Sequence, residues 1–214
     1  MKVNSKKTQM LCVHANYNNE ISTYIRSEQG EIESGKTLKI LGFNFSNEPN
    51  ANVHVMGVID KLYGKLWTLR FLKRSSMSEG DLLNIYKTVL RPSAEYSSIV
   101  YNTLIPEYIS DKLETVQRPA MKIIFGYNVD FGKLVEEGKI ETLKKRREYN
   151  SLKFALKAAN SGRFGKLWFE ENSNDRVVRP TTREKFKMKH WRTERGRNNP
   201  VSHMTKLLNE HFSK

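Results

Sequence analysis

The sequence has little cysteine, no long apolar run, and fewer acidic than basic residues. Its 214 residues include one cysteine, Cys12, which excludes an internal disulfide and a cysteine-rich zinc site. The longest apolar run is four residues, 10–13. A membrane span needs about 20 such residues and a secretory signal roughly 7–15. We therefore expect an intracellular protein, nuclear or cytoplasmic, without a signal peptide, a transmembrane segment or a membrane partner.

The sequence contains few aspartates, and none of them is next to another. The sequence holds five aspartates, no two of them adjacent: Asp60, Asp81, Asp111, Asp130 and Asp175. A two-metal phosphoryl-transfer site needs several carboxylates to hold its Mg²⁺ ions. Cys12 and His14 are two residues apart, but no further ligand accompanies them. We expect no metal site in this chain.

Basic residues dominate what is present. Lys and Arg number 37 against 23 Asp and Glu, a net charge of +14, which favours phosphate-bearing partners. Residues 176–197 hold nine cations and two glutamates, with Phe186, Met188 and Trp191 interleaved. This composition suits phosphate contact and base stacking, the alternative being a solvated charge run. The predicted nucleic-acid-binding residues are Arg176, Arg179, Arg183, Lys185, Lys187, Lys189, Trp191, Arg192, Arg195 and Arg197.

The apolar pattern predicts an α+β fold that is mostly α. Residues 1–48 read as β-rich, with short strands at 10–13 and 22–27 and an alternating run at 37–45. Residues 49–168 read as a helical domain, and residues 169–214 as a basic segment that ends in a short helix, 202–212.

Five amphipathic helices are predicted in residues 49–168. The first carries an apolar stripe at helical spacing: Val55, Ile59, Leu62, Leu66 and Leu69. The second opens with a capping box at Ser78 and ends at Arg91-Pro92. Helices at 109–125, 131–137 and 141–160 follow, and Gly126 and Gly138 end the first two of these.

Five large aromatic residues on these helices could pack in the core or stack on bases. We expect all five in the core: Trp67, Tyr86, Tyr96, Tyr101 and Trp168.

Several motifs occur in a recognisable order. They are VNSKKT at residues 3–8, LKILGF at 38–43, SEGDLLNIYKTVLRPSAEYSSIVYN at 78–102, KLETVQRPAMKIIFG at 112–126 and IETLKKRR at 140–147. In this order and spacing the chain resembles the C-terminal portion of reverse transcriptases from non-LTR (LINE-like) retrotransposons. The resemblance covers the end of the palm, the primer grip, the thumb and the C-terminal basic segment.

The resemblance implies roles for three residues. Lys7 would contact the incoming nucleotide's phosphates or the pyrophosphate leaving group, the alternative being a solvated turn lysine. Leu41 and Gly42 would belong to the primer-grip hairpin, where glycine permits close backbone approach. The alternative is a glycine that eases a strand bend.

The resemblance also implies partners and a missing centre. The partners are RNA, the RNA–DNA template–primer duplex and the upstream remainder of the polymerase. The full-length RNA-directed DNA polymerase, a nucleotidyltransferase, needs Mg²⁺, and its paired aspartates are absent here. We expect the catalytic strand upstream of Met1 and an inactive chain without it. Pro119 departs from the family pattern inside helix 109–125, so either the helix bends or this copy of the element has begun to decay.

Two alternatives from other classes stay open. The chain could be a stand-alone basic helical module that binds nucleic acid, or a helical scaffold for protein interaction whose charge serves solubility. Salt-sensitive binding to nucleic acid separates these two alternatives.

Overall fold

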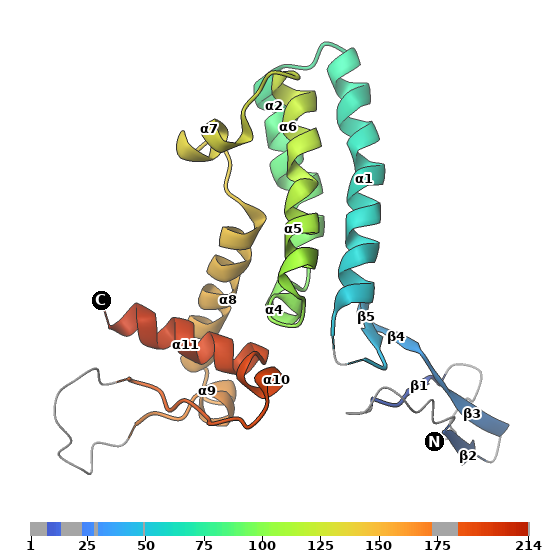
Figure 1. Cartoon of the computed structure of the whole chain (residues 1–214), viewed down its shortest axis with the longest axis vertical. Helices are drawn as coiled ribbons and strands as arrows, with labels where there is room; N and C mark the ends of the chain where they lie inside the picture. The colour runs from blue at the N-terminus through green and yellow to red at the C-terminus, as the bar shows by residue number, and fades with distance from the viewer. Residues whose placement is uncertain (1–7, 14–22, 28–29, 49, 173–183, 214) are drawn as a thin grey trace.

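The structure, a computed structural model, describes residues 8–13, 23–27, 30–48, 50–172 and 184–213. It is 59% helical with a few short strands in two sheets, which confirms the predicted mostly helical α+β class. Helix α1, Asn52–Arg74, runs along one side of the helical bundle, and the strands lie at its N-terminal end (Figure 1).

The strands form two small sheets. In the first, β1 (Met10–Leu11) pairs in parallel with β3 (Gly30–Gly35), and β2 (Tyr24–Ser27) pairs antiparallel with β3. In the second, β4 (Thr37–Ile40) and β5 (Phe43–Ser46) form an antiparallel hairpin. The strand pattern predicted across residues 37–45 is therefore wrong at its centre, where Leu41 and Gly42 reverse the chain.

Both turn residues have a positive φ, 48° at Leu41 and 84° at Gly42. Positive φ at both central positions of a two-residue loop matches the twist of the flanking strands, so the turn favours this hairpin.

Helix α1 buries the predicted stripe, Val55, Ile59, Leu62, Leu66 and Leu69. This face packs on α5 (Glu107–Thr115) and α6 (Gln117–Phe125), which follow each other along the bundle (Figure 1). The prediction that Trp67 lies in the core is wrong: its side chain is 63% exposed, because position 67 lies outside the buried stripe.

The second helical region does not end at Arg91-Pro92. Helix α2 (Glu79–Ile85) starts at the predicted cap, where the Ser78 hydroxyl accepts from the Asp81 N–H. It continues through a π-helical turn, η1 (Tyr86–Leu90), into α3 (Arg91–Glu95). Pro92 lies in the first turn of α3. The wider π turn before it accommodates the proline, which cannot donate a backbone hydrogen bond.

The π turn also keeps one face of this region buried. Leu82, Tyr86, Leu90 and Ala94 are all buried and lie four residues apart. In a regular helix each four-residue step overshoots a turn by about 40°, so such a row drifts off the core. The wider π turn corrects that drift.

The helix predicted at 109–125 is interrupted at Val116, between α5 and α6. Pro119 is consequently the third residue of α6, in the first turn, where a backbone N–H has no partner within the helix. The chain thus accommodates this proline at a break in the helix. Gly126 ends α6 with a φ of 100°, as predicted.

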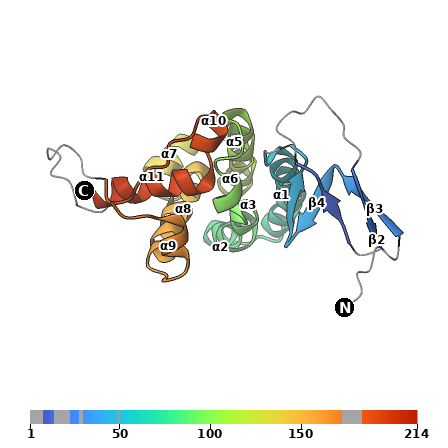
Figure 2. The same ribbon diagram turned by 90° about the horizontal axis from the view of Figure 1, so that it is seen from below.

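The remaining helices are α4 (Ser98–Tyr101), α7 (Phe131–Glu136), α8 (Leu143–Ala159), α9 (Phe164–Trp168), α10 (Glu194–Arg197) and α11 (Pro200–Phe212). Helix α11 packs across α8 (Figures 1 and 2). A core of Ala155, Ala158, Phe169, Phe186, Met204 and Leu208 joins them. The described part of the basic segment is therefore packed against the bundle.

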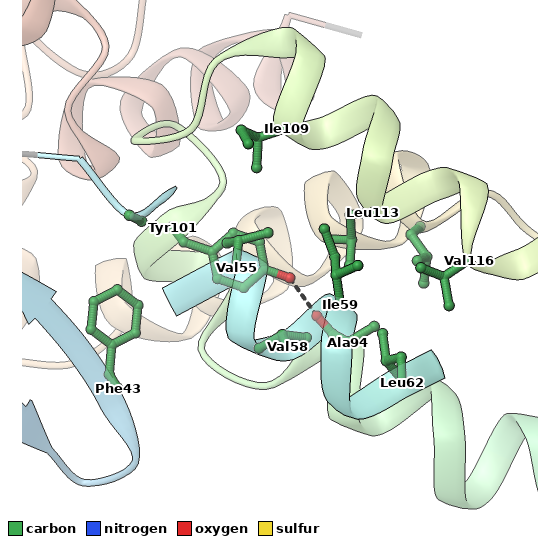
Figure 3. Packing of buried hydrophobic residues seen from close by; sticks show 12 residues of the cluster. Phe43, Val55, Val58, Ile59, Leu62, Ala94, Tyr101, Ile109, Leu113 and Val116 are labelled. Atoms are coloured by element: carbon green, nitrogen blue, oxygen red, sulfur yellow. Dashed lines mark hydrogen bonds between the residues drawn. The ribbon is translucent and has the colours of Figure 1, made fainter. Parts of the chain in front are cut away.

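A second core joins the β4–β5 hairpin to the helices (Figure 3). Phe43 of the hairpin lies in the same cluster as Val55 of α1 and Tyr101 of α4, and the Tyr101 hydroxyl donates to the Ala94 carbonyl. Tyr86 and Tyr101 are core residues, as predicted. Trp168 is half-buried against the α8–α11 core, whereas Tyr96 is 51% exposed, contrary to prediction, because it follows the end of α3.

Candidate nucleic-acid interface

Four of the predicted site residues, Lys7, Arg176, Arg179 and Arg183, lie outside the described residues. Leu41 and Gly42 form the hairpin tip, with the Leu41 side chain 89% exposed.

Contacts on both sides fix the hairpin. The Tyr96 hydroxyl donates to the Leu41 carbonyl, and a Cβ added at Gly42 would lie 3.3 Å from that hydroxyl. Below the tip, the Asn44 N–H donates to Nδ1 of the buried His54, whose ring stacks on Phe43. Burial lowers the pKa of His54, and the charge of Lys61 lowers it further. The tip is thus a rigid, exposed turn.

The basic segment uses several of its predicted residues for packing. Phe186 is buried, and Asn209 bonds both its N–H (2.9 Å) and its carbonyl (3.0 Å). Lys187 Nζ lies 2.5 Å from Glu170 Oε1, and this cation lowers the pKa of the Glu170 carboxyl. Lys185 Nζ lies 4.1 Å from the centre of the Phe212 ring.

Other residues of this segment are open to solvent. Lys189, Arg192 and Arg197 are exposed, and Trp191 is 45% exposed while its Nε1 donates to Ser202. Arg195 is the second residue of α10. Lys187, Lys189 and Trp191 line one pocket and Arg197 lines another, so the described residues of this segment are divided between two surfaces.

A second basic surface lies between α1 and α6, which we call the α1–α6 groove. It has a volume of about 750 Å³. Five cations line it, Arg70, Lys73, Arg74, Arg118 and Lys122, and none of the described lining residues is acidic. Lys73 Nζ donates to the Ile124 carbonyl (2.8 Å) and lies 3.7 Å from Glu79, so four of the five cations have no ion pair within the described chain.

The helical period explains this groove. In α6, Gln117, Ala120, Met121 and Ile124 are buried, which leaves Arg118 and Lys122 exposed one turn apart. In α1, Arg70 and Arg74 follow the last buried position, Leu69. Because α1 and α6 pack side by side (Figure 1), the two rows of cations face a common solvent space.

A row of exposed aromatic rings adjoins the groove. Tyr63, Trp67 and Phe71 recur every four residues along α1 and are 45%, 63% and 53% exposed. The Trp67 and Phe71 rings stack with centroids 5.5 Å apart. Arg70 follows Trp67, and Arg74 follows Phe71, by three residues, close to one helical turn, so rings and cations share this part of α1. We call these three residues the aromatic row.

From the sequence, Trp67 was expected in the core, and neither Arg118 nor Lys122 was a predicted site residue. The spacing of Tyr63, Trp67 and Phe71, four residues apart and out of phase with Leu62, Leu66 and Leu69, could have revealed the aromatic row.

No protein-family model, curated protein or solved structure matches the chain. In the described residues, no three His, Cys, Asp or Glu side chains gather in a way that could hold a metal ion. None of the described helices combines the length and apolar character needed to cross a membrane.

Proposed function

We propose that this chain is the end of the palm, the primer grip, the thumb and the basic C-terminal segment of a non-LTR retrotransposon reverse transcriptase, and that it holds the template–primer duplex. The order of sequence motifs supports the family. The α1–α6 groove supports the role, because it gathers five cations without an acidic neighbour in the described lining. The aspartates that hold Mg²⁺ would come from another part of the polymerase.

Each cation that neutralises a phosphate releases condensed counterions, so binding weakens as salt rises. Cations of this kind contact the backbone and carry no sequence information. The proposed binding is consequently strong at low salt and indifferent to sequence.

The hairpin tip and the groove lie near opposite ends of α1. The 23 residues of this helix extend over about 35 Å, close to the length of ten base pairs of duplex. One duplex lying along α1 would reach both surfaces, with the Leu41-Gly42 turn at one end and Arg74 at the other. Gly42 has no side chain to hinder approach of a sugar–phosphate backbone.

The test is fluorescence anisotropy of the full chain with a labelled RNA–DNA hybrid over a series of salt concentrations. Replacing Arg70, Arg74, Arg118 and Lys122 by Gln removes four cations from the groove. We expect the slope of log K against log salt to become shallower by about 3–4, since each phosphate contact contributes roughly 0.9.

The matched control replaces four exposed lysines away from the groove, Lys133, Lys139, Lys153 and Lys157, by Gln. It has the same net charge as the groove variant, and we expect its slope to change by less than about 1. Equal changes in both variants would show that the whole positive field, and no particular surface, attracts the nucleic acid.

The aromatic row favours a second candidate, a stand-alone module that binds nucleic acid. Exposed rings stack on unpaired bases and contribute about 1–3 kcal/mol per base. Replacing Trp67 and Phe71 by Ala should then weaken binding to single-stranded RNA more than binding to the hybrid. A greater loss on the hybrid would favour the polymerase role.

A further inference from the structure

Arg147, in the middle of α8, is a buried cation without an acidic hydrogen-bond partner. Its side chain is 1% exposed. Nε donates to Asn102 Oδ1 at 3.0 Å and Nη2 donates to Ser110 Oγ at 2.5 Å. Nη1 has no hydrogen-bond partner within the described chain. The nearby carboxylate of Glu114 instead accepts from the N–H groups of Leu143 and Lys144, at the start of α8.

This arrangement is costly in the folded chain. The transfer of a guanidinium from water into the protein interior is unfavourable unless an anion compensates its charge. The Glu114 carboxylate interacts with this charge at a distance, since burial raises the pKa of that carboxyl and the cation opposes the rise, but no hydrogen bond joins the two groups. The two partners, an amide and a hydroxyl, are neutral dipoles. The neighbouring Arg146 is different, because its guanidinium forms two hydrogen bonds with the Glu95 carboxylate.

Arg147 lines a pocket of about 360 Å³ between the α4–α5 connection, α8 and the α10–α11 pair. Two further lining residues, Thr103 and His203, have buried polar atoms, Oγ1 and Nε2, without a partner in the described chain. Three buried polar atoms without a hydrogen-bond partner among the described residues thus belong to side chains that line one pocket. Since buried polar groups are almost always hydrogen-bonded, their meeting indicates a polar ligand.

The charges around the pocket define the chemistry of that ligand. Arg147, Lys144, Arg197 and Lys206 are cationic, and Glu107 and Glu148 are acidic. The four cations and two carboxylates of the lining give a net charge of +2. This charge is complementary to that of a phosphomonoester, about −1.5 to −2 at pH 7. A pocket of this volume is at the small end of the range of ligand sites, roughly 300–1,000 Å³.

We propose that this pocket binds a phosphate group with about two negative charges, either the free phosphate ion or the terminal phosphomonoester of a nucleotide or oligonucleotide. The buried guanidinium of Arg147 supplies a fixed positive charge, and Lys144, Arg197 and Lys206 contact the anion from the exposed side. Because Arg197 belongs to α10 and Lys206 to α11, the bound anion also holds these helices against α8. This site is separate from the α1–α6 groove and does not depend on the proposed function.

The test uses the full chain and isothermal titration with three probes: inorganic phosphate, a trinucleotide with a 5′-phosphate, and the same trinucleotide without it. We expect saturable binding of phosphate or of the phosphorylated trinucleotide, and no comparable binding of the third probe. Tighter binding of the phosphorylated trinucleotide identifies a terminal phosphate as the ligand, and equal or tighter binding of inorganic phosphate identifies the free ion. Failure of both phosphate probes to bind saturably would overturn the proposal.

Variants locate the binding. Replacing the exposed pair Lys144 and Lys206 by Gln should weaken the phosphate affinity about tenfold or more, whereas Lys153→Gln with Lys157→Gln, on the same helix α8, should leave it unchanged. Arg147→Lys keeps the charge but loses the planar fork and should also weaken binding. Arg118→Gln with Lys122→Gln in the groove should leave it unchanged. An equal loss with the Lys153 and Lys157 pair would contradict a specific site.

Discussion

The hydroxyl of Tyr96, the residue that follows α3, donates a hydrogen bond to the backbone carbonyl of Leu41 at the hairpin tip. The two residues are 55 positions apart in the sequence. This bond, together with the bond from Asn44 to His54, attaches the β4–β5 hairpin to the helices at two points. The hairpin tip is therefore positioned by α1 and by the end of α3.

Gly42→Ala should destabilise the chain by about 1–2 kcal/mol, because a residue with a side chain is strained at a φ of 84°. The added methyl would also press on the Tyr96 ring, 3.4 Å away at its nearest carbon. Denaturant unfolding measures the change. The control, Gly64→Ala in α1, has open space around the new methyl and should stabilise by about 0.5–1 kcal/mol. A neutral result at Gly42 would contradict the observed turn.

Stability should decrease as the pH falls below about 6.5. His54 must be unprotonated at Nδ1 to accept from Asn44, and burial lowers its pKa from 6.5. Below that pH the unfolded chain binds more protons than the folded chain, so stability present above it is lost as the pH falls. Burial also lowers the pKa of His203, so this residue too contributes stability that is lost as the pH falls.

His54→Asn tests this prediction, because Asn retains an acceptor near the position of Nδ1 and does not titrate. Thermal unfolding at about pH 7.5 and pH 5 should show a smaller difference for the variant than for the natural chain. If the variant and the natural chain lose equal stability between the two pH values, groups other than His54 cause the pH dependence.

Glu95→Gln should cost about 1.5–3 kcal/mol, the range for hydrogen bonds to charged groups. The Glu95 carboxylate binds Arg146 of α8 at 2.8 and 3.2 Å and lies 3.4 Å from Arg91, with all three side chains mostly buried. The change leaves Arg91 without a counterion and Arg146 with Glu141 as its remaining carboxylate partner. Glu137→Gln, which removes the exposed pair with Lys139, should change unfolding by less than about 0.5 kcal/mol. Similar losses at both positions would refute the distinction.

Within the basic segment, Lys189→Gln with Arg192→Gln should reduce the salt dependence of hybrid binding more than Lys185→Gln with Lys187→Gln. Lys187 contacts Glu170 and Lys185 contacts the Phe212 ring, whereas Lys189 and Arg192 have no ion pair or ring contact among the described residues. Both variants remove two cations, so the comparison is matched. The measurement is the slope of log K against log salt, and the reverse order would contradict the prediction.

The purified chain should not synthesise DNA. Phosphoryl transfer depends on metal ions held by carboxylates, and the five aspartates of this sequence are dispersed. The assay is incorporation of labelled deoxynucleotides on an RNA template with a DNA primer and Mg²⁺ or Mn²⁺. Incorporation above a blank, by a preparation free of contaminating polymerase, would place an active site in this chain.

Local patterns in the sequence predicted most of the helices. The stripe on α1, the cap at Ser78 and the stop at Gly126 depend on neighbouring residues, and the structure confirms each. The helix end predicted at Pro92 was wrong because a π turn can absorb a proline, which depends on packing.

The candidate sites were harder to predict because their members are distant in sequence. The groove combines Arg70 with Arg118, which meet only because α1 packs on α6. The basic neighbours of Phe186 suggested that its ring stacks on bases, yet the ring is buried against Phe169 and Asn209 bonds its backbone. The density of basic residues in the sequence identified the basic segment. It did not indicate which of those cations form ion pairs or ring contacts in the folded chain.

The π turn at Tyr86–Leu90 limits how this region can change in length. Deleting one residue there would restore a regular helix but rotate every later position by about 100° relative to α2. Ala94 would leave the core, and Tyr96 would turn away from Leu41. This stretch can therefore accept substitutions far more readily than insertions or deletions. An insertion or a deletion would displace the hairpin tip, because Tyr96 would no longer reach Leu41.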